Sequence, residues 1–151
     1  MTQAQPGEGA AVGRLVHALI CELAPEGRPA PPLEEFEEVA TRLLSDSSHY
    51  YWAFLARNAR AEPIGVLTLN QCAATYARGR FGEIAELYVV PRGRSAEVGA
   101  GLLSAALTFA RARGWHRLEV GAPAVPRFQR TVNFYVRNSF VEVGPRLSYA
   151  L

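Results

Sequence analysis

The sequence predicts an α/β (α+β) fold in which a mixed, mostly antiparallel central sheet is flanked by helices. Two observations carry this prediction. Short runs rich in branched and aromatic residues, which favour strands, alternate with longer runs whose apolar residues recur about every 3.6 positions, as in amphipathic helices. After two helical segments, these runs follow the order β-β-β-α-β-α-β along the chain.

Length and composition predict one globular domain. The chain has 151 residues, of which 49% are hydrophobic and 20% are charged, and its net charge of +2 does not indicate nucleic-acid or membrane binding. Cys21 and Cys72 are isolated thiols without metal-site spacing, so we expect no metal and a reduced, cytoplasmic setting. No run is apolar and long enough to span a bilayer, and the first residues lack a signal-peptide pattern.

The N-terminal part predicts two helices. Residues 1–9 are polar and contain glycine, so we expect them to be disordered and the folded domain to cover residues 10–151. Val12–Leu23 places its apolar residues on one helical face and ends before a proline. Leu33–Leu44 begins with glutamates and ends near an arginine, an order that suits the helix dipole.

The middle of the chain predicts an antiparallel hairpin followed by a strand, a tight turn and a helix. Tyr50–Arg57 and Ile64–Asn70 are the two strands of the hairpin, and we expect a loop over Gln71–Gly82. Glu83–Val90 is the central strand, which Pro91 ends because proline cannot donate to a sheet ladder.

A helix follows the central strand after a short basic turn. Ser95 is the N-cap candidate and Gly114 supplies the stop. Unpaired backbone N–H groups at the start of such a helix can bind an anion. The turn and the first helical residues are therefore a candidate anion site.

The C-terminal part predicts one helix between short strands. Arg117–Val120 is a strand, Phe128–Arg137 a helix, and Phe140–Val143 and Arg146–Tyr149 are closing strands. Exposed strand edges near this end of the chain leave a homodimer open.

The central stretch resembles the central motif of the GNAT family of N-acetyltransferases, V-x-P-x-x-R-G-x-G-x-G/A-x-x-L-L. The run from Val89 to Leu103 matches this motif in length without gaps. Arg94 falls on its Arg/Gln position and Gly99 on its last Gly/Ala position. In that family the turn cradles the pyrophosphate of acetyl-CoA.

A second resemblance to the same family lies in residues 128–140, which correspond to the pattern N-x-x-A-x-x-F-Y-x-x-x-G-F. This chain keeps Phe134, Tyr135 and Phe140 of that pattern. Together the two resemblances cover the chain from Tyr50 to its end. The family usually opens with a β-strand, and nothing before Val12 has a strand pattern, so we expect this N-terminal strand to be missing or rudimentary.

The resemblance implies an N-acetyltransferase that passes an acetyl group from acetyl-CoA directly to a primary amine of a small molecule or peptide. The acidic start of the second helix leaves a cationic acceptor open, and the loop over Gln71–Gly82 could cover the acceptor site. The resemblance implies that acetyl-CoA, as co-substrate, is bound by Leu87, Tyr88, Val89, Arg94, Ser95, Ala96, Glu97, Val98, Gly99, Ala100, Phe128 and Phe134.

Acetyl transfer to an amine needs a base, because a free amine is mostly protonated at neutral pH. Glu83 and Glu86 are the carboxylates of the central strand, and both positions have acid/base precedents in the family. Their spacing places them on opposite faces of the sheet unless a bulge intervenes, and we rank Glu86 first. Tyr135 is the matching candidate for the acid that protonates the leaving thiolate. A surface role for the glutamates and a core role for Tyr135 are the alternatives.

A second function remains open, that of a degenerate module with the same fold that senses a ligand or binds another protein. Ser95, Glu97 and Phe128 replace residues that the cofactor site of the family normally uses. The side chain of Glu97 discriminates between the two functions, because a carboxylate that points into the cradle would repel the diphosphate.

Overall fold

The computed structural model describes residues 1–25, 29, 31–94, 96–123, 125–144 and 147. The chain divides into two compact units, Met1–Glu119 and Val120–Leu151, and each is described by itself. The prediction of one domain over residues 10–151 stays a prediction. Among the described residues no helix has the length and apolar character needed to cross a membrane.

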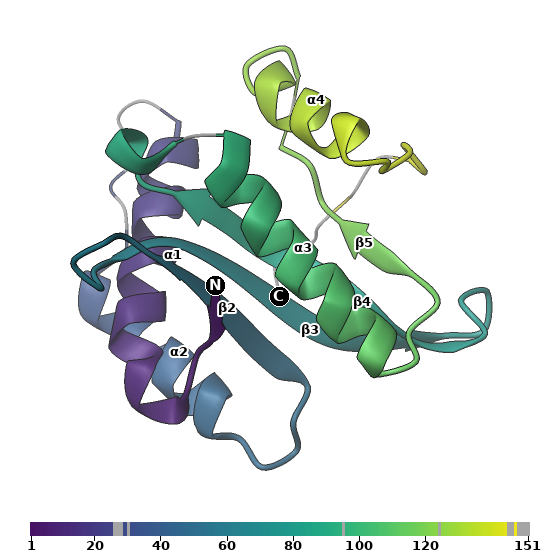
Figure 1. Cartoon of the computed structure of the whole chain (residues 1–151), viewed down its shortest axis with the longest axis horizontal. Coiled ribbons are helices and arrows are strands. Elements are labelled where there is room, and N and C mark those ends of the chain that lie inside the picture. The colour runs from purple at the N-terminus through teal and green to yellow at the C-terminus, as the bar shows by residue number, and fades with distance from the viewer. Residues whose placement is uncertain (26–28, 30, 95, 124, 145–146, 148–151) are drawn as a thin grey trace. The chain divides into compact units, whose positions relative to one another are not determined.

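The first unit is built on an open sheet whose five strands follow each other in chain order (Figure 1). The first four strands are paired antiparallel, which confirms the predicted mixed, mostly antiparallel sheet. The strands are β1 (Thr2–Gln3), β2 (Tyr51–Arg57), β3 (Pro63–Ala74), β4 (Gly79–Val89) and β5 (Leu118–Val120). The helices of the chain are α1 (Gly9–Leu23), α2 (Leu33–Ser45), α3 (Ala96–Ala112) and α4 (Gln129–Arg137), with short 3-10 helices η1 (Pro6–Glu8) and η2 (Pro91–Gly93).

The two faces of the sheet bury different sets of side chains, as the alternation of a strand requires. One face carries Leu55 and Val66, which form a core cluster with Val12 and Val16 of α1 and with α2. The other face packs against α3, where Trp52 and Phe54 lie at ring distances of 5.1 and 5.5 Å from Phe109. In Figure 1, α1 and α2 accordingly lie on one side of the sheet and α3 on the other.

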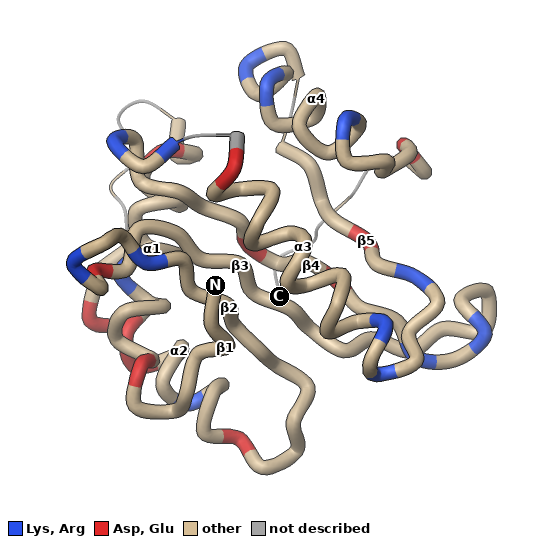
Figure 2. The backbone as a smooth tube through the Cα atoms, viewed as in Figure 1, with Lys and Arg blue, Asp and Glu red and all other residues tan. Residues whose placement is uncertain are grey.

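The predicted loop over Gln71–Gly82 is wrong, because β3 and β4 continue as a paired ladder. The register runs from Gln71↔Gly82 to Ala74↔Gly79 and leaves only a short turn over residues 75–78. A tertiary contact that the local sequence does not show accompanies this pairing: a Cβ on Gly82 would lie 2.5 Å from the ring of Trp115. Figure 2 shows that the end of this hairpin is basic. The segment therefore forms a hairpin rather than a loop, and its role over the acceptor site stays a prediction.

The N-terminus is ordered, so the expected disorder of residues 1–9 is wrong. Thr2 and Gln3 pair with β2, and the Ala4 amide donates to the Ala53 carbonyl at 2.8 Å, which buries Ala4. The edge of β2 offers backbone partners that a polar sequence can use as well as an apolar one. A two-residue edge strand agrees with the expectation of a missing or rudimentary first strand.

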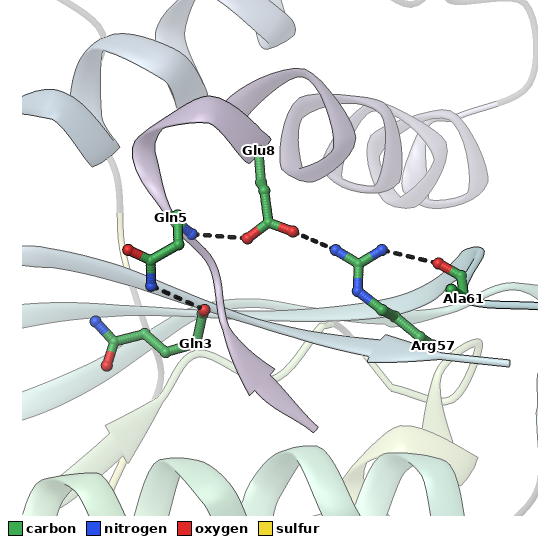
Figure 3. A network of polar contacts seen from close by, with 5 residues as sticks. All are labelled: Gln3, Gln5, Glu8, Arg57 and Ala61. Atoms are coloured by element: carbon green, nitrogen blue, oxygen red, sulfur yellow. Dashed lines mark hydrogen bonds and ion pairs between the residues drawn. The ribbon is translucent and has the colours of Figure 1, made fainter.

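A polar network holds the turn that follows β1 (Figure 3). The Glu8 carboxylate accepts a 2.8 Å hydrogen bond from the Gln5 amide and forms an ion pair with Arg57 at the end of β2. Arg57 also donates to the Ala61 carbonyl at 2.9 Å. The network therefore ties the beginning of the chain to the β2–β3 turn.

Helix α3 ends where the sequence predicts. Gly114 adopts a φ of +70°, its amide donates to the Arg111 carbonyl, and the next amide, that of Trp115, donates to the Ala110 carbonyl, both at 3.0 Å. This pair of bonds is the usual helix stop that places glycine in a left-handed conformation.

The second unit contains α4 and the segment after it. The predicted strand Phe140–Val143 is wrong: the Phe140 amide donates back to the Tyr135 carbonyl at 3.0 Å, and Val141 and Val143 are exposed. An alternating apolar pattern makes a strand only when a neighbour pairs with it. The second predicted closing strand, Arg146–Tyr149, lies outside the described residues except for Leu147.

Candidate active site

A β-bulge in β4 shapes the centre of the first unit. Leu67 pairs with Leu87 and Leu69 pairs with Ile84, so the single residue Thr68 faces two residues of β4, Ala85 and Glu86. The extra residue restarts the alternation and places Glu86 on the same face as Glu83. We expected these two glutamates on opposite faces of the sheet unless a bulge intervened. A bulge does intervene, so the placement on opposite faces is wrong.

Thr68 fastens the bulge. Its side chain is fully buried, and its hydroxyl accepts a 3.1 Å hydrogen bond from the Glu86 amide while donating to the Glu86 carboxylate. The bulge takes the Glu86 amide out of the regular ladder, and a buried unpaired amide costs about 1–3 kcal/mol. One hydroxyl thus satisfies the backbone of the bulge and orients the carboxylate.

The surroundings of Glu86 make its carboxylate more basic than usual. Burial raises the pKa of Glu86, the hydrogen bond from Thr68 opposes that rise, and the nearby charge of Glu83 adds to it. Burial, followed by the charge of Glu86, also raises the pKa of Tyr51, so this phenol keeps its proton and can donate. The site therefore combines the Glu86 carboxylate, whose proton affinity is raised, with the hydroxyl groups of Thr68 and Tyr51.

A cavity of about 290 Å³ opens beside Glu86 between the sheet and the first two helices. Tyr51 and Glu86 come from the sheet, and the remaining walls come from α1, α2 and the end of the loop between them. The lining residues are Gly13, Val16, Pro31, Glu35, Phe36, Val39, Ala40, Leu43, Tyr51 and Glu86. Glu83 is not among them; its carboxylate lies 3.7 Å from the Cys72 thiol. Of the two candidate bases, the cavity reaches Glu86.

The C-terminal end of β4 has backbone groups directed away from β3. The Val90 amide donates to the Ile64 carbonyl at 2.9 Å, and antiparallel alternation then turns the amides of Leu87 and Val89 outward, while that of Tyr88 faces β3. On the outer side, the Gly82 amide donates to the Arg117 carbonyl at 3.1 Å, at the opposite end of β4. Because β5 has three residues, it extends only about 10 Å along β4.

Arg94 is held by three groups at the turn before α3. Its Nε donates to the Val89 carbonyl at 2.9 Å, its guanidinium forms an ion pair with Glu22 of α1, and it lies 5.5 Å from the centre of the Tyr88 ring. These contacts connect the end of β4 with α1. They fix the path of the chain into α3.

The first turns of α3 contain the other predicted cofactor residues of the first unit, Ala96, Glu97, Val98, Gly99 and Ala100. The Glu97 side chain is exposed, so water solvates its carboxylate. Figure 2 shows basic positions in the segment that leads into α3 and an acidic one at its start. The predicted N-cap and cofactor roles of Ser95 lie outside the described residues. A basic turn before a long helix can bind an anion.

The remaining predicted residues lie in the second unit. Phe128 immediately precedes α4, and Tyr135 is buried between the rings of Phe134 and Phe140 at 5.3 and 5.4 Å. Burial raises the pKa of Tyr135, so the phenol keeps its proton. The role of Tyr135 as an acid stays a prediction.

Two side chains of the site, Tyr51 and Thr68, were not singled out from the sequence. A usable signal exists for Thr68, which is a hydroxyl within the apolar run of its strand, where a buried polar group must have a partner. Tyr51 gave no such signal, because aromatic residues are common in strands. Among the described residues no group of His, Cys, Asp or Glu is arranged to hold a metal.

Fold and site together define an α/β protein with an open sheet, a bulged central strand and a basic turn leading into a long helix. The chain belongs to the acetyltransferase (GNAT) family, whose model matches residues 15–140. No curated protein matches the chain significantly.

Solved structures share this fold over nearly the whole chain. A candidate acetyltransferase from Arthrobacter sp. FB24 is 25% identical, with a TM-score of 0.75 over 99% of this chain and 93% of that one. An aminoglycoside acetyltransferase from an uncultured soil metagenomic sample, in complex with trehalose, is 18% identical, with a TM-score of 0.75 over 99% and 94%. A predicted acetyltransferase from Clostridium acetobutylicum, with acetyl-CoA, is 16% identical, with a TM-score of 0.77 over 99% and 94%.

Proposed function

We propose that this protein is an acetyl-CoA-dependent N-acetyltransferase that acts on a primary amine of a small molecule by direct transfer within a ternary complex. The observation that carries the proposal is Glu86, a carboxylate of raised pKa that lines a cavity beside the central strand. A base in that position is what an amine acceptor needs. Family membership supports the acetyl donor, and one structural neighbour contains acetyl-CoA.

In the proposed reaction Glu86 accepts a proton from the ammonium form of the acceptor. The neutral amine then attacks the thioester carbonyl, a C–N bond forms and the C–S bond breaks. The nitrogen releases its second proton to solvent, from which Tyr135 regains the proton that it gives to the thiolate. The outward amides of Leu87 and Val89 hold the donor along the edge of β4 and stabilise the charge on the carbonyl oxygen. Tyr135 is proposed to protonate the departing thiolate, and Glu83 to raise the basicity of Glu86 through its charge.

The proposed donor site combines the end of β4 with the start of α3. It comprises Leu87–Val89 and Arg94–Ala100, while the cofactor roles of Phe128 and Phe134, in the second unit, stay predictions. Arg94 is proposed to act mainly through the turn that it holds, since its guanidinium already binds Glu22 and the Val89 carbonyl. Backbone amides of the helix start would then contact the diphosphate.

Calorimetric titration with acetyl-CoA at moderate salt tests the donor site. We expect a dissociation constant in the micromolar range and only a small change, about threefold or less, in Glu97→Gly. The exposed Glu97 carboxylate is screened by water, where two charges 4 Å apart interact by only about 1 kcal/mol.

Two results would favour the degenerate module instead. If neither the wild-type protein nor Glu97→Gly binds acetyl-CoA, the proposed donor site is contradicted. Binding by Glu97→Gly alone would show that this carboxylate blocks the cradle of the natural chain. Ser104→Ala, an exposed change in the middle of α3, is the control for nonspecific effects of altering this helix.

Thr68→Val tests the link between the bulge and the base. The hydrogen bond from Thr68 lowers the pKa of Glu86, so its removal raises that pKa further. We expect the acidic limb of the pH profile of kcat/KM to move to higher pH in Thr68→Val and to stay close to wild type in Thr68→Ser, which keeps the hydroxyl. A limb that does not move in Thr68→Val would contradict the assignment of this limb to Glu86.

A further inference from the structure

The polarity of the side chains that line the cavity beside Glu86 indicates what kind of ligand it can bind. Its side chains include Val16, Phe36, Val39, Ala40 and Leu43, contributed by α1 and α2. Among the described lining residues Tyr51 is the only uncharged polar side chain, and it lies on the sheet beside Glu86. Apart from Glu35 of α2, the described side chains of the helical walls are apolar, and the other polar side chains, Tyr51 and Glu86, lie on the sheet wall.

The charged residues of the lining are both acidic. Glu86 lies inside, half-buried, and Glu35 lies exposed on α2; among the lining residues that the structure describes there is no Arg, Lys or His. These two carboxylates attract a cation and repel a carboxylate or phosphate of the ligand, and the described part of the lining offers no basic side chain to compensate. Amino acids, which carry a carboxylate beside the amine, are disfavoured on this ground.

The size and the walls of the cavity limit the body of the amine. A volume of about 290 Å³ lies at the low end of the usual range for ligand pockets. An aminoglycoside would press several hydroxyl and amino groups against apolar side chains, and each buried group without a partner costs about 1–3 kcal/mol. An alkyl or aryl-alkyl chain instead gains from contact with the same walls.

We infer that the acceptor is a small, singly charged primary amine with an apolar alkyl or aryl-alkyl body. Its ammonium group meets Glu86 and Tyr51, its body lies between α1 and α2, and Glu35 attracts the cation and repels acidic ligands. This inference rests on the proposed function for its catalytic consequence. The aminoglycoside acetyltransferase among the structural neighbours shares the fold, whereas the lining described above belongs to this chain.

The first test compares amines as ligands and as substrates of the full chain. Hexylamine, phenethylamine, 6-aminohexanoate and sisomicin are titrated calorimetrically in the presence of CoA and then assayed for thiol release from acetyl-CoA. We expect hexylamine and phenethylamine to exceed the other two by about tenfold or more in affinity and in kcat/KM, as one or two unfavourable polar contacts predict. Stronger binding or faster acetylation of sisomicin or 6-aminohexanoate would overturn the inference.

The titrations separate failure of this inference from failure of the proposed function. If sisomicin is acetylated and hexylamine is not, the inference of an apolar acceptor is overturned, while the proposed acetyltransferase activity stands. Binding of hexylamine without acetyl transfer to any amine would support the character of the cavity and overturn the proposed activity. Absence of hexylamine binding and of its acetylation would overturn the inference.

Variants on α2 locate the effect in the cavity. Val39→Thr keeps the volume of a partly exposed side chain and adds a hydroxyl, so we expect about a threefold loss in affinity for hexylamine.

Glu35→Gln is expected to reduce the discrimination against 6-aminohexanoate by about threefold, because an exposed charge contributes only a small interaction energy. Glu34→Gln is the matched control, because Glu34 is exposed on the same helix and is not part of the lining. Equal effects of the Glu34 and Glu35 variants would contradict the assigned role of Glu35.

Discussion

Glu86→Gln is expected to lower kcat/KM for acetyl transfer by about 10²–10⁴-fold, the usual contribution of a general base. The amide keeps the shape of the side chain and can still accept the hydrogen bond from Thr68, so the bulge should persist. What the substitution removes is the ability to take a proton from the acceptor. Affinity for acetyl-CoA should stay within about twofold of wild type, because the proposed donor site lies along the backbone of β4 and α3.

The same substitution is expected to make the protein more stable above neutral pH. Burial raises the pKa of Glu86 in the folded state, so its ionisation opposes folding. The favourable contribution of the protonated group is complete below the unfolded pKa, about 4.3, and is lost as pH rises through the higher folded pKa. Glutamine carries no charge at any pH. The melting temperature of Glu86→Gln should therefore exceed that of wild type at pH 8, with a difference that shrinks toward pH 4.

Glu83→Gln is the matched control for both measurements. It removes the neighbouring charge that raises the pKa of Glu86, so the acidic limb of the pH profile should move to lower pH while the maximal rate falls much less. Thermal unfolding followed by circular dichroism and steady-state thiol release are the measurements. A larger rate loss in Glu83→Gln than in Glu86→Gln would transfer the role of base to Glu83.

The sequence predicted the elements that follow from local periodicity and missed those fixed by distant contacts. The helix after the central strand and its stop at Gly114 were readable, because apolar spacing and a left-handed glycine are local signals. The continued pairing within Gln71–Gly82 is accompanied by close packing of Trp115 on Gly82, from more than thirty positions away. Order at the N-terminus likewise depends on the edge of β2.

The candidate site shows the same division. Both glutamates of the central strand were identified from residue type and position, but the face on which they lie depends on one inserted residue in the ladder. Alternation alone cannot reveal a bulge, since a strand with period 2 looks the same on either side of it. The hydroxyl of Thr68, which satisfies the bulge from the neighbouring strand, was the available hint.

The close approach of α1 and α2 depends on Gly13, which neither periodicity nor motif singled out. A Cβ built at this position would lie 2.6 Å from the Glu37 Cα and from the Phe36 carbonyl oxygen. Backbone atoms of a packed helix cannot move aside as the tip of a side chain can. Gly9, one turn earlier, meets Thr41 in the same way, at 2.4 Å from its Cα. The two glycines therefore form a stripe that lets α2 lie against α1.

Gly13→Ala is expected to destabilise the fold by about 1–3 kcal/mol, even though alanine itself favours a helix by about 1 kcal/mol over glycine. A loss of that size lowers the melting temperature by about 2–4 °C per kcal/mol for a chain of this length. Because Gly13 also lines the cavity, separation of the helices should raise KM for the amine more than KM for acetyl-CoA.

Gly7→Ala separates this packing effect from the general effect of replacing glycine. A Cβ at Gly7 would meet nothing within 4 Å, and its backbone is not left-handed, so the substitution should be neutral or slightly stabilising. Chemical denaturation of the two variants and wild type measures the difference directly. If Gly13→Ala unfolds at the same denaturant concentration as Gly7→Ala, the helices can separate at little cost, and the cavity between them is adjustable. If it unfolds earlier and its KM for the amine rises, contact between α1 and α2 at Gly13 sets both the stability of the fold and the width of the acceptor cavity.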